Sequence, residues 1–159
     1  MSVELIKEEN TINTIRELVT HYGKERAELI PILQDINAKH GYISPDAIKE
    51  LSLMMNIPTN EIFTVATFYR MLSTKPRGKH LIQFCNSAPC HVVGGRQVWL
   101  ALKKELGLES DETSKDNKWT LQTTSCLGVC GIGPVLVIDQ DIYGNVLPEQ
   151  VKNILSRYE

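Results

Sequence analysis

The stretch "TTSCLGVCGIGPVLVID" (residues 123–139) decides how the second half of this chain folds. Two cysteines, Cys126 and Cys130, lie in a glycine-rich loop, and the apolar segment 134–139 that follows has the composition of a buried strand. Before the loop, residues 118–124 alternate between apolar and polar side chains, which predicts another strand. Both thiols are therefore expected in a loop between two strands.

A second cysteine pair lies upstream, in "QFCNSAPCHVVGG" (83–95). Cys85 and Cys90 follow a predicted buried strand, 80–84, and precede a predicted helix, 92–106. The spacing is C-x4-C, then 35 intervening residues, then C-x3-C. If the two strands that precede the pairs are neighbours that end on the same side of a sheet, the four thiols meet there.

The rest of the second half completes a β-α-β, β-β-α order, with a short strand and turn in "DIYGN" and a last helix from Pro148. "ESDETSKDN" (109–117) is expected to be a polar loop. A boundary is expected at "KPRGK", where Pro and Gly interrupt the pattern. The fold class is therefore α+β, with an N-terminal helical bundle (1–75) followed by a second domain (76–159).

Within the first half, apolar residues recur at helical spacing in four segments. Ser44 and Pro45 are expected to begin the third helix as N-cap and first residue, and Gly41 to end the second. Thr59 or Asn60 is the candidate N-cap of the fourth. The aromatic residues of that helix, Phe63, Phe68 and Tyr69, are expected in the core.

The composition and the start of the sequence argue against several classes of protein. The 159 residues carry a net charge of −2 and are 42% hydrophobic, which does not suggest a nucleic-acid-binding surface. The start of the sequence resembles neither a signal nor a transit peptide, and no apolar run could span a bilayer, so we expect a cytoplasmic protein. Cysteines are reduced in that compartment, which favours metal binding over disulfides.

Four thiolates can hold a tetrahedral zinc ion or a [2Fe–2S] cluster with two thiolates on each iron, whereas a redox-active C-x-x-C is absent. A cluster with four thiolates is anionic, and backbone N–H groups near the sulfurs offset its charge. Gly128, Gly131 and Gly133 let the backbone approach closely, and Cys90 precedes a predicted helix N-terminus. These features favour the cluster.

Other residue patterns predict no second site. The chain has neither a G-x-G-x-x-G fingerprint nor a phosphate-binding loop, so we expect it to bind neither NAD nor flavin by itself. No side chain is assigned a role as acid, base or nucleophile, so the catalytic set is empty. His91 adjoins Cys90 and is expected beside the site rather than as a ligand, since four cysteines complete it.

The sequences "CNSAPCHVVGG", "TTSCLGVCGIGPVLVID" and "VATFYRML" resemble a known family. It comprises the small iron–sulfur subunit of NADH:quinone oxidoreductase (respiratory complex I) and the matching subunits of NAD-linked hydrogenases, including electron-bifurcating ones, and of NAD-dependent formate dehydrogenases. The resemblance runs from about residue 12 to the C-terminus. It implies a thioredoxin-like ferredoxin domain in which Cys85, Cys90, Cys126 and Cys130 bind one [2Fe–2S] cluster.

The resemblance also implies a function. The chain is expected to be an electron carrier without a substrate site of its own, exchanging single electrons with the flavin of a larger NAD(H)-binding iron–sulfur subunit. FMN and NAD(H) are expected only on that partner subunit. Further hydrogenase, dehydrogenase or complex I subunits are expected to complete the assembly. The expected location is the cytoplasm or the cytoplasmic face of a membrane complex. The alternative is a structural zinc adaptor built on the same cysteines. The sequence does not distinguish the parent complexes, nor whether Gly133–Pro134 is cis.

Overall fold

The computed structural model describes residues 2–158, with side chains from Asn10 onward, and divides into two compact units, Met1–Pro76 and Arg77–Glu159. The first unit is built from helices, and the second combines helices with a five-stranded sheet. The predicted α+β class is therefore confirmed. Among the helices described, none is both long enough and apolar enough to cross a membrane.

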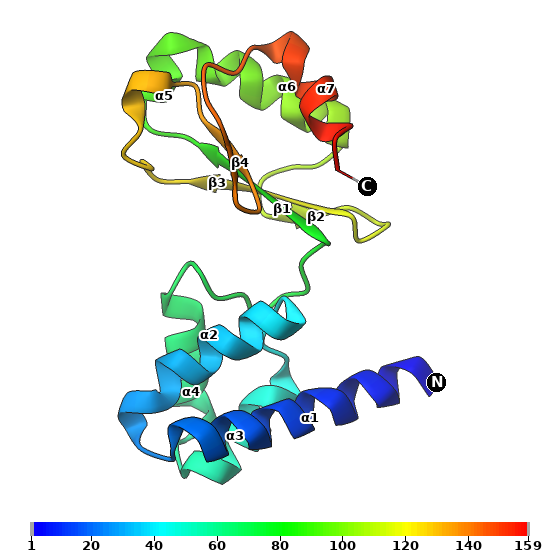
Figure 1. The fold of residues 1–159 in the computed structure, drawn as a ribbon, viewed down its shortest axis with the longest axis vertical. Helices are drawn as coiled ribbons and strands as arrows, with labels where there is room; N and C mark the ends of the chain where they lie inside the picture. Colours follow the sequence, from blue (N-terminus) through cyan, green and yellow to red (C-terminus); the bar gives the residue numbers. More distant parts are fainter. Residues whose placement is uncertain (1, 159) are drawn as a thin grey trace. The chain divides into compact units, whose positions relative to one another are not determined.

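Four helices form the first unit: α1 (Ser2–Tyr22), α2 (Leu29–His40), α3 (Pro45–Met55) and α4 (Thr59–Phe68), with a 3₁₀ turn at Arg26–Glu28 (Figure 1). Their apolar faces meet in one core, in which the fully buried side chains include Ile15, Ile32, Leu33, Ile36, Leu51 and Ile62. Burial of these faces, rather than intrinsic helix propensity, stabilises helices of this length.

The expected caps of α2 and α3 are confirmed. Ser44 accepts a hydrogen bond from the backbone N–H of Ala47 at 3.1 Å, and Gly41 ends α2 in the left-handed conformation (φ 79°). The expectation for α4 was wrong, because Pro58 holds the N-cap position and no side chain caps the helix. Proline has a fixed φ that suits a helix start, so the turn forms without a side-chain acceptor.

The aromatic residues of α4 also differ from expectation. Phe63 and Phe68 are 50% and 78% exposed, and only Tyr69 packs against the core. Ile62 and Ala66 are buried and share one helical stripe with Tyr69 at i, i+4 and i+7, which leaves the two phenylalanines off that stripe.

The second unit contains a mixed sheet in the order β2-β3-β1-β4-β5. Its central pair, β1 (His80–Cys85) and β3 (Trp119–Thr124), is parallel, while β2 (Glu112–Thr113), β4 (Leu136–Ile138) and β5 (Asp141–Tyr143) pair antiparallel with their neighbours. Helices α6 (Arg96–Leu106) and α7 (Val151–Leu155) lie together on one face of the sheet (Figure 1). The predicted β-α-β, β-β-α order is present.

Two details of this unit were not predicted. The polar loop contains β2, in which Glu112 is paired with Leu121. The helix expected from residue 92 begins instead as a short turn, α5 (Ala88–Cys90), passes through an irregular turn, η2 (His91–Gly95), and becomes regular only in α6. Gly94 interrupts it with a φ of 103°, a value that glycine adopts readily.

Alternation along the strands separates two buried clusters. Phe84 faces the helices, where it stacks on Trp99 with ring centroids 5.5 Å apart, and the next residue, Cys85, faces the opposite way with Val135 and Val137. Because successive side chains of a strand point to opposite faces, the sulfur of Cys85 lies on the side away from α6.

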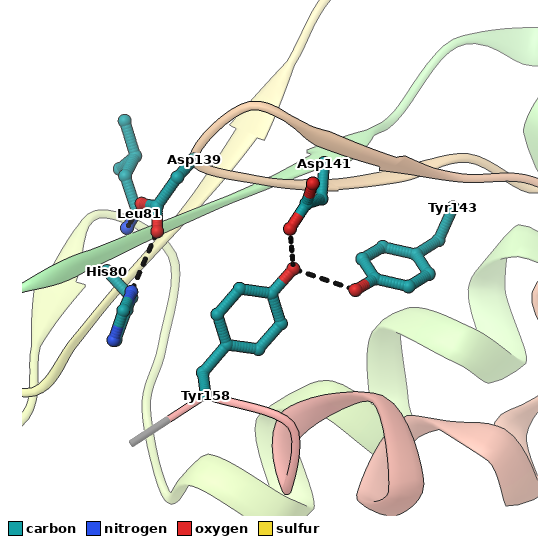
Figure 2. Close-up of polar contacts among 6 residues, drawn as sticks. All are labelled: His80, Leu81, Asp139, Asp141, Tyr143 and Tyr158. Atoms are coloured by element: carbon teal, nitrogen blue, oxygen red, sulfur yellow. Dashed lines mark hydrogen bonds and ion pairs between the residues drawn. The ribbon is translucent and has the colours of Figure 1, made fainter.

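A hydrogen-bond network holds β5 against the C-terminal segment (Figure 2). The Tyr158 hydroxyl donates to Asp141 Oδ2 at 2.7 Å and lies 2.7 Å from the Tyr143 hydroxyl, which acts as the donor to it. At the other end of the β4–β5 turn, Asp139 accepts from the backbone N–H of Leu81 at 2.8 Å and lies 2.7 Å from His80 Nδ1 (Figure 2). The position of β5 is thus fixed from both sides.

Candidate metal centre

The parallel pairing of β1 and β3 brings the two cysteine loops to one edge of the sheet. Cys85, the last residue of β1, is in register with Thr124, the last residue of β3. Cys126 lies two residues beyond Thr124, and Cys130 begins a 3₁₀ turn, η3 (Cys130–Ile132). The predicted condition, neighbouring strands that end on the same side, is therefore met.

The four sulfurs differ in exposure. Cys85 and Cys90 are each 2% exposed, whereas Cys126 and Cys130 are on the surface, and all four are free thiols. Cys126 Sγ and Cys130 Sγ lie 3.5 Å apart, and Cys85 and Cys90 are close enough that interaction with the Cys90 thiol lowers the pKa of Cys85. The site thus consists of a buried sulfur pair and an exposed one.

The two pairs are close enough to affect each other's ionisation. Burial, followed by the hydrogen bond to Cys85, raises the pKa of Cys90, and the negative charge of Cys130 raises it further. The hydrogen bond to Cys126 is the main cause that raises the pKa of Cys130, and the charge of Cys85 contributes. Residues far apart in the sequence therefore form one cluster of interacting thiols.

Backbone N–H groups act on the cysteine sulfurs. Burial raises the pKa of Cys85, but hydrogen bonds from the N–H groups of Ser87 and Leu127, together with the Cys90 thiol, outweigh it and place that pKa below its ordinary value. Val135 N–H lowers the pKa of Cys90 against the larger effect of burial. Gly128 N–H donates to Cys126 Sγ at 3.4 Å. Such donors stabilise negative charge on sulfur.

Glycine was expected to let the backbone approach the sulfurs closely, and Gly133 is the clearest case. A Cβ atom at Gly133 would lie 3.3 Å from Cys90 Sγ and 3.2 Å from Val93 Cγ2, so the backbone of the second loop approaches the buried sulfur closely. Gly128 has a φ of 80°, which other residues adopt only with strain. Gly131 has open space around it and ordinary φ.

The donor set fits a [2Fe–2S] cluster. In such a cluster each iron takes two protein thiolates, and the sulfurs here lie as two pairs with N–H donors around them. Among the side chains that the structure describes (residues 10–158), no group of three or more His, Cys, Asp or Glu is arranged to hold one ion. His91, beside Cys90, is exposed.

Sequence reasoning did not identify the individual N–H donors, since Ser87 and Val135 carry no motif that marks them. It also left the Gly133–Pro134 bond open, and this peptide bond is cis. In the loop before β3, Asn117 adopts a left-handed turn conformation with φ 55°, which asparagine tolerates better than most residues.

Comparisons with known proteins agree with this centre. Residues 15–159 match the family model for the thioredoxin-like [2Fe–2S] ferredoxin. An NADH-quinone oxidoreductase subunit from Salmonella typhimurium is 34% identical over 139 residues, which cover 87% of this chain and 84% of that protein. The corresponding NADH-quinone oxidoreductase subunit from Pseudomonas aeruginosa is 33% identical over 146 residues, covering 92% and 88%.

A solved structure of an NAD⁺-reducing [NiFe]-hydrogenase has the same fold over 82% of this chain, with a TM-score of 0.69 and 18% identity, and this chain corresponds to 22% of that longer one. The resemblance seen in the sequence is thus confirmed. The family's cofactor is one [2Fe–2S] cluster, which takes up and releases single electrons, so this is an electron-transfer protein. The chain belongs to the thioredoxin-like [2Fe–2S] ferredoxin family.

Proposed function

We propose that Cys85, Cys90, Cys126 and Cys130 are the ligands of the cluster, with the buried pair on one iron and the exposed pair on the other. The carrying observation is that the thiols come together as two pairs at one sheet edge, with Cys126 Sγ and Cys130 Sγ 3.5 Å apart. This pairing favours the cluster over the zinc alternative, because a lone zinc ion takes its ligands as a single tetrahedral group.

When bound, the cluster supplies a one-electron oxidation and reduction. The residues of the chain hold it and adjust its charge balance. The N–H groups of Ser87, Leu127 and Val135 oppose the negative charge on the buried sulfurs, and that of Gly128 does so on Cys126. Hydrogen bonds to sulfur and solvent access are the usual means by which a protein tunes such a centre.

Electrons are proposed to enter and leave through the exposed pair. The loop segments 86–95 and 125–134 contain no Asp, Glu, Lys or Arg, in a chain that is 23% charged. Val92 is 84% exposed and Leu127 40% exposed beside the cysteines. An uncharged surface with exposed apolar side chains suits a stable protein neighbour better than solvent.

The neighbour that we propose is the larger flavin- and NAD(H)-binding subunit of an oxidoreductase complex, with which the cluster exchanges single electrons. The names of the relatives support a complex of the NADH-quinone oxidoreductase type, and the fold shared with the NAD⁺-reducing hydrogenase extends the proposal to hydrogenases. The proposal also includes formate dehydrogenases, because of the sequence resemblance.

We also propose that residues 1–75 form a separate domain that docks on a partner subunit. Phe63, Phe68 and Met71 are each at least half exposed on this helical unit. Large exposed apolar side chains of this kind are typical of protein–protein contact sites.

The exchange with the partner is tested by adding NADH to the full chain alone and to the natively purified complex, and following the reduced cluster by electron paramagnetic resonance. The proposal predicts a signal from the complex and none from the isolated chain. Reduction of the isolated chain by NADH, or no reduction in the complex, would contradict it.

A further inference from the structure

The segment just after β5 lies against the second cysteine loop. Asn145 N–H donates to the carbonyl of Ile132 at 2.6 Å, and Val146 N–H donates to the carbonyl of Pro134 at 3.2 Å. Residues 144–146 thus run alongside residues 132–134, which lie two to four residues beyond Cys130 in the loop. We name residues 144–146 the buttress.

Gly144, the first residue of the buttress, has no room for a side chain. A Cβ atom there would lie 2.7 Å from Ile132 Cδ1, 2.8 Å from Ile132 Cβ and 2.9 Å from Ile132 O. The first of these atoms can rotate away, but the other two move only with the backbone of η3. Any side chain at position 144 therefore has to displace either the buttress or the loop.

We expect the cysteine loop, rather than the buttress, to move. The buttress is anchored by Val146, which is 2% exposed, and by β5, which the hydrogen bonds of Tyr143 and Asp141 with Tyr158 hold in place (Figure 2). Ile132, by contrast, is 40% exposed and lies in a single 3₁₀ turn. Displacement is therefore directed into η3.

On its far side the loop meets the buried sulfur pair. Gly133 follows Ile132 directly, and a Cβ atom on Gly133 would lie only 3.3 Å from Cys90 Sγ. The N–H of Gly133 donates to the carbonyl of Cys130 at 3.2 Å, which ties the turn to that cysteine. A shift of Ile132 is thus passed both to Cys130 and to the backbone against Cys90.

We propose that Gly144 is a positioning residue for the metal centre: its missing side chain lets the buttress hold the Cys130 loop at the distance from Cys90 that the cluster needs. The inference rests on the proposed assignment of the cysteines as ligands. The three atoms nearest to a Cβ at position 144 all belong to Ile132, so Gly144 acts on the centre through Ile132 and Gly133.

The test compares Gly144→Ala with Gly131→Ala in the full chain carrying its cluster. Gly131 lies directly beside Cys130, but a Cβ there meets nothing within 4 Å and its φ is not positive, so it is the matched control. We expect Gly144→Ala to change the g values of the reduced cluster and its reduction potential, and to release iron to a chelator about tenfold faster, as overpacking of this severity implies. Gly131→Ala should match the wild type in all three.

The readouts separate this inference from the proposed function. A wild-type chain without a cluster would overturn the ligand assignment, whereas a wild-type cluster with Gly144→Ala indistinguishable from Gly131→Ala would overturn only the role of Gly144. If Gly144→Ala holds no cluster at all, the double variant Gly144→Ala/Ile132→Gly decides, since it removes the two side-chain contacts. Recovery of the cluster supports the proposal, and failure to recover it refutes the Ile132 side chain as the group through which residue 144 acts on the centre.

Discussion

Replacement of Gly128 by alanine isolates the effect of backbone conformation in the cysteine loop. Gly128 has a φ of 80° and places its N–H 3.4 Å from Cys126 Sγ, yet a Cβ atom there would meet nothing within 4 Å. The substitution therefore adds no steric clash with other residues of the chain. Its whole effect comes from holding an L-residue in the left-handed region.

The expected change in the free energy of unfolding for Gly128→Ala is the sum of two opposing contributions. The left-handed conformation costs an alanine about 1–2 kcal/mol. Alanine also lowers the entropy of the unfolded chain, which offsets about 0.4–1 kcal/mol of that cost. We expect a net destabilisation of about 1 kcal/mol for Gly128→Ala and a smaller one for Gly128→Asn, since asparagine tolerates this region better. Gly131→Ala, which has no strain to add, should be neutral or slightly stabilising.

Unfolding in urea is the assay, followed by tryptophan fluorescence and by bleaching of the visible absorption of the cluster. The chain has two tryptophans, Trp99 and Trp119, and both lie in the second unit, so the fluorescence reports on that unit alone. Strain of about 1 kcal/mol that is released on unfolding should speed unfolding about fivefold.

The ranking of the variants is what tests the reasoning. Unfolding rates should fall in the order Gly128→Ala, Gly128→Asn, wild type, with Gly131→Ala at or below the wild type. Equal rates for the alanine variants at positions 128 and 131 would refute the claim that the left-handed turn at Gly128 holds the loop.

Three further predictions concern other parts of the chain. Cys126→Ser should abolish or severely alter the visible absorption of the cluster while the circular dichroism of the helical unit is retained, and an unchanged spectrum would count against this cysteine as a ligand. Tyr158→Phe removes a hydroxyl that donates to Asp141, and should lower the free energy of unfolding by about 1–2 kcal/mol in chemical denaturation. Burial, followed by hydrogen bonds, raises the pKa of Tyr158 above its ordinary value of 10.0, so the folded state keeps the proton to higher pH than the unfolded state. The stability that this provides is present below about pH 10 and declines above it. The free energy of unfolding of Tyr158→Phe should therefore decline less steeply at alkaline pH than that of the wild type. Ser44→Ala deletes the side-chain acceptor for Ala47 N–H and should destabilise the helical unit by about 1 kcal/mol without altering the resonance spectrum of the cluster, whereas Ser44→Asp should retain stability.

The sequence was most informative where a local pattern and the tertiary structure agree. The strands that precede each cysteine pair are apolar or alternating, so their presence and the convergence of the loops were predictable, and the register of Cys85 with Thr124 is present as required. The helix stop at Gly41 and the cap at Ser44 depend on residues next to them in the chain. Such local signals survive because no distant contact opposes them.

Features that depend on distant contacts were missed. Strand β2 is two residues long, and only its pairing with β3 makes Glu112 part of a sheet. Phe63 and Phe68 are as apolar as core residues, but the neighbouring helices determine which stripe of α4 is buried. The contact of Gly144 with Ile132 joins two segments whose proximity no spacing in the sequence indicates.

X-ray absorption at the iron edge of the full chain, purified without reconstitution, tests the central claim most directly. If the four cysteines hold a [2Fe–2S] cluster in two pairs, each iron has only sulfur in its first coordination sphere and a second iron as its nearest metal neighbour, with iron and acid-labile sulfide in the proportions of one cluster per chain. A protein that instead carries zinc without a metal neighbour, or iron bound by nitrogen or oxygen, would contradict the account.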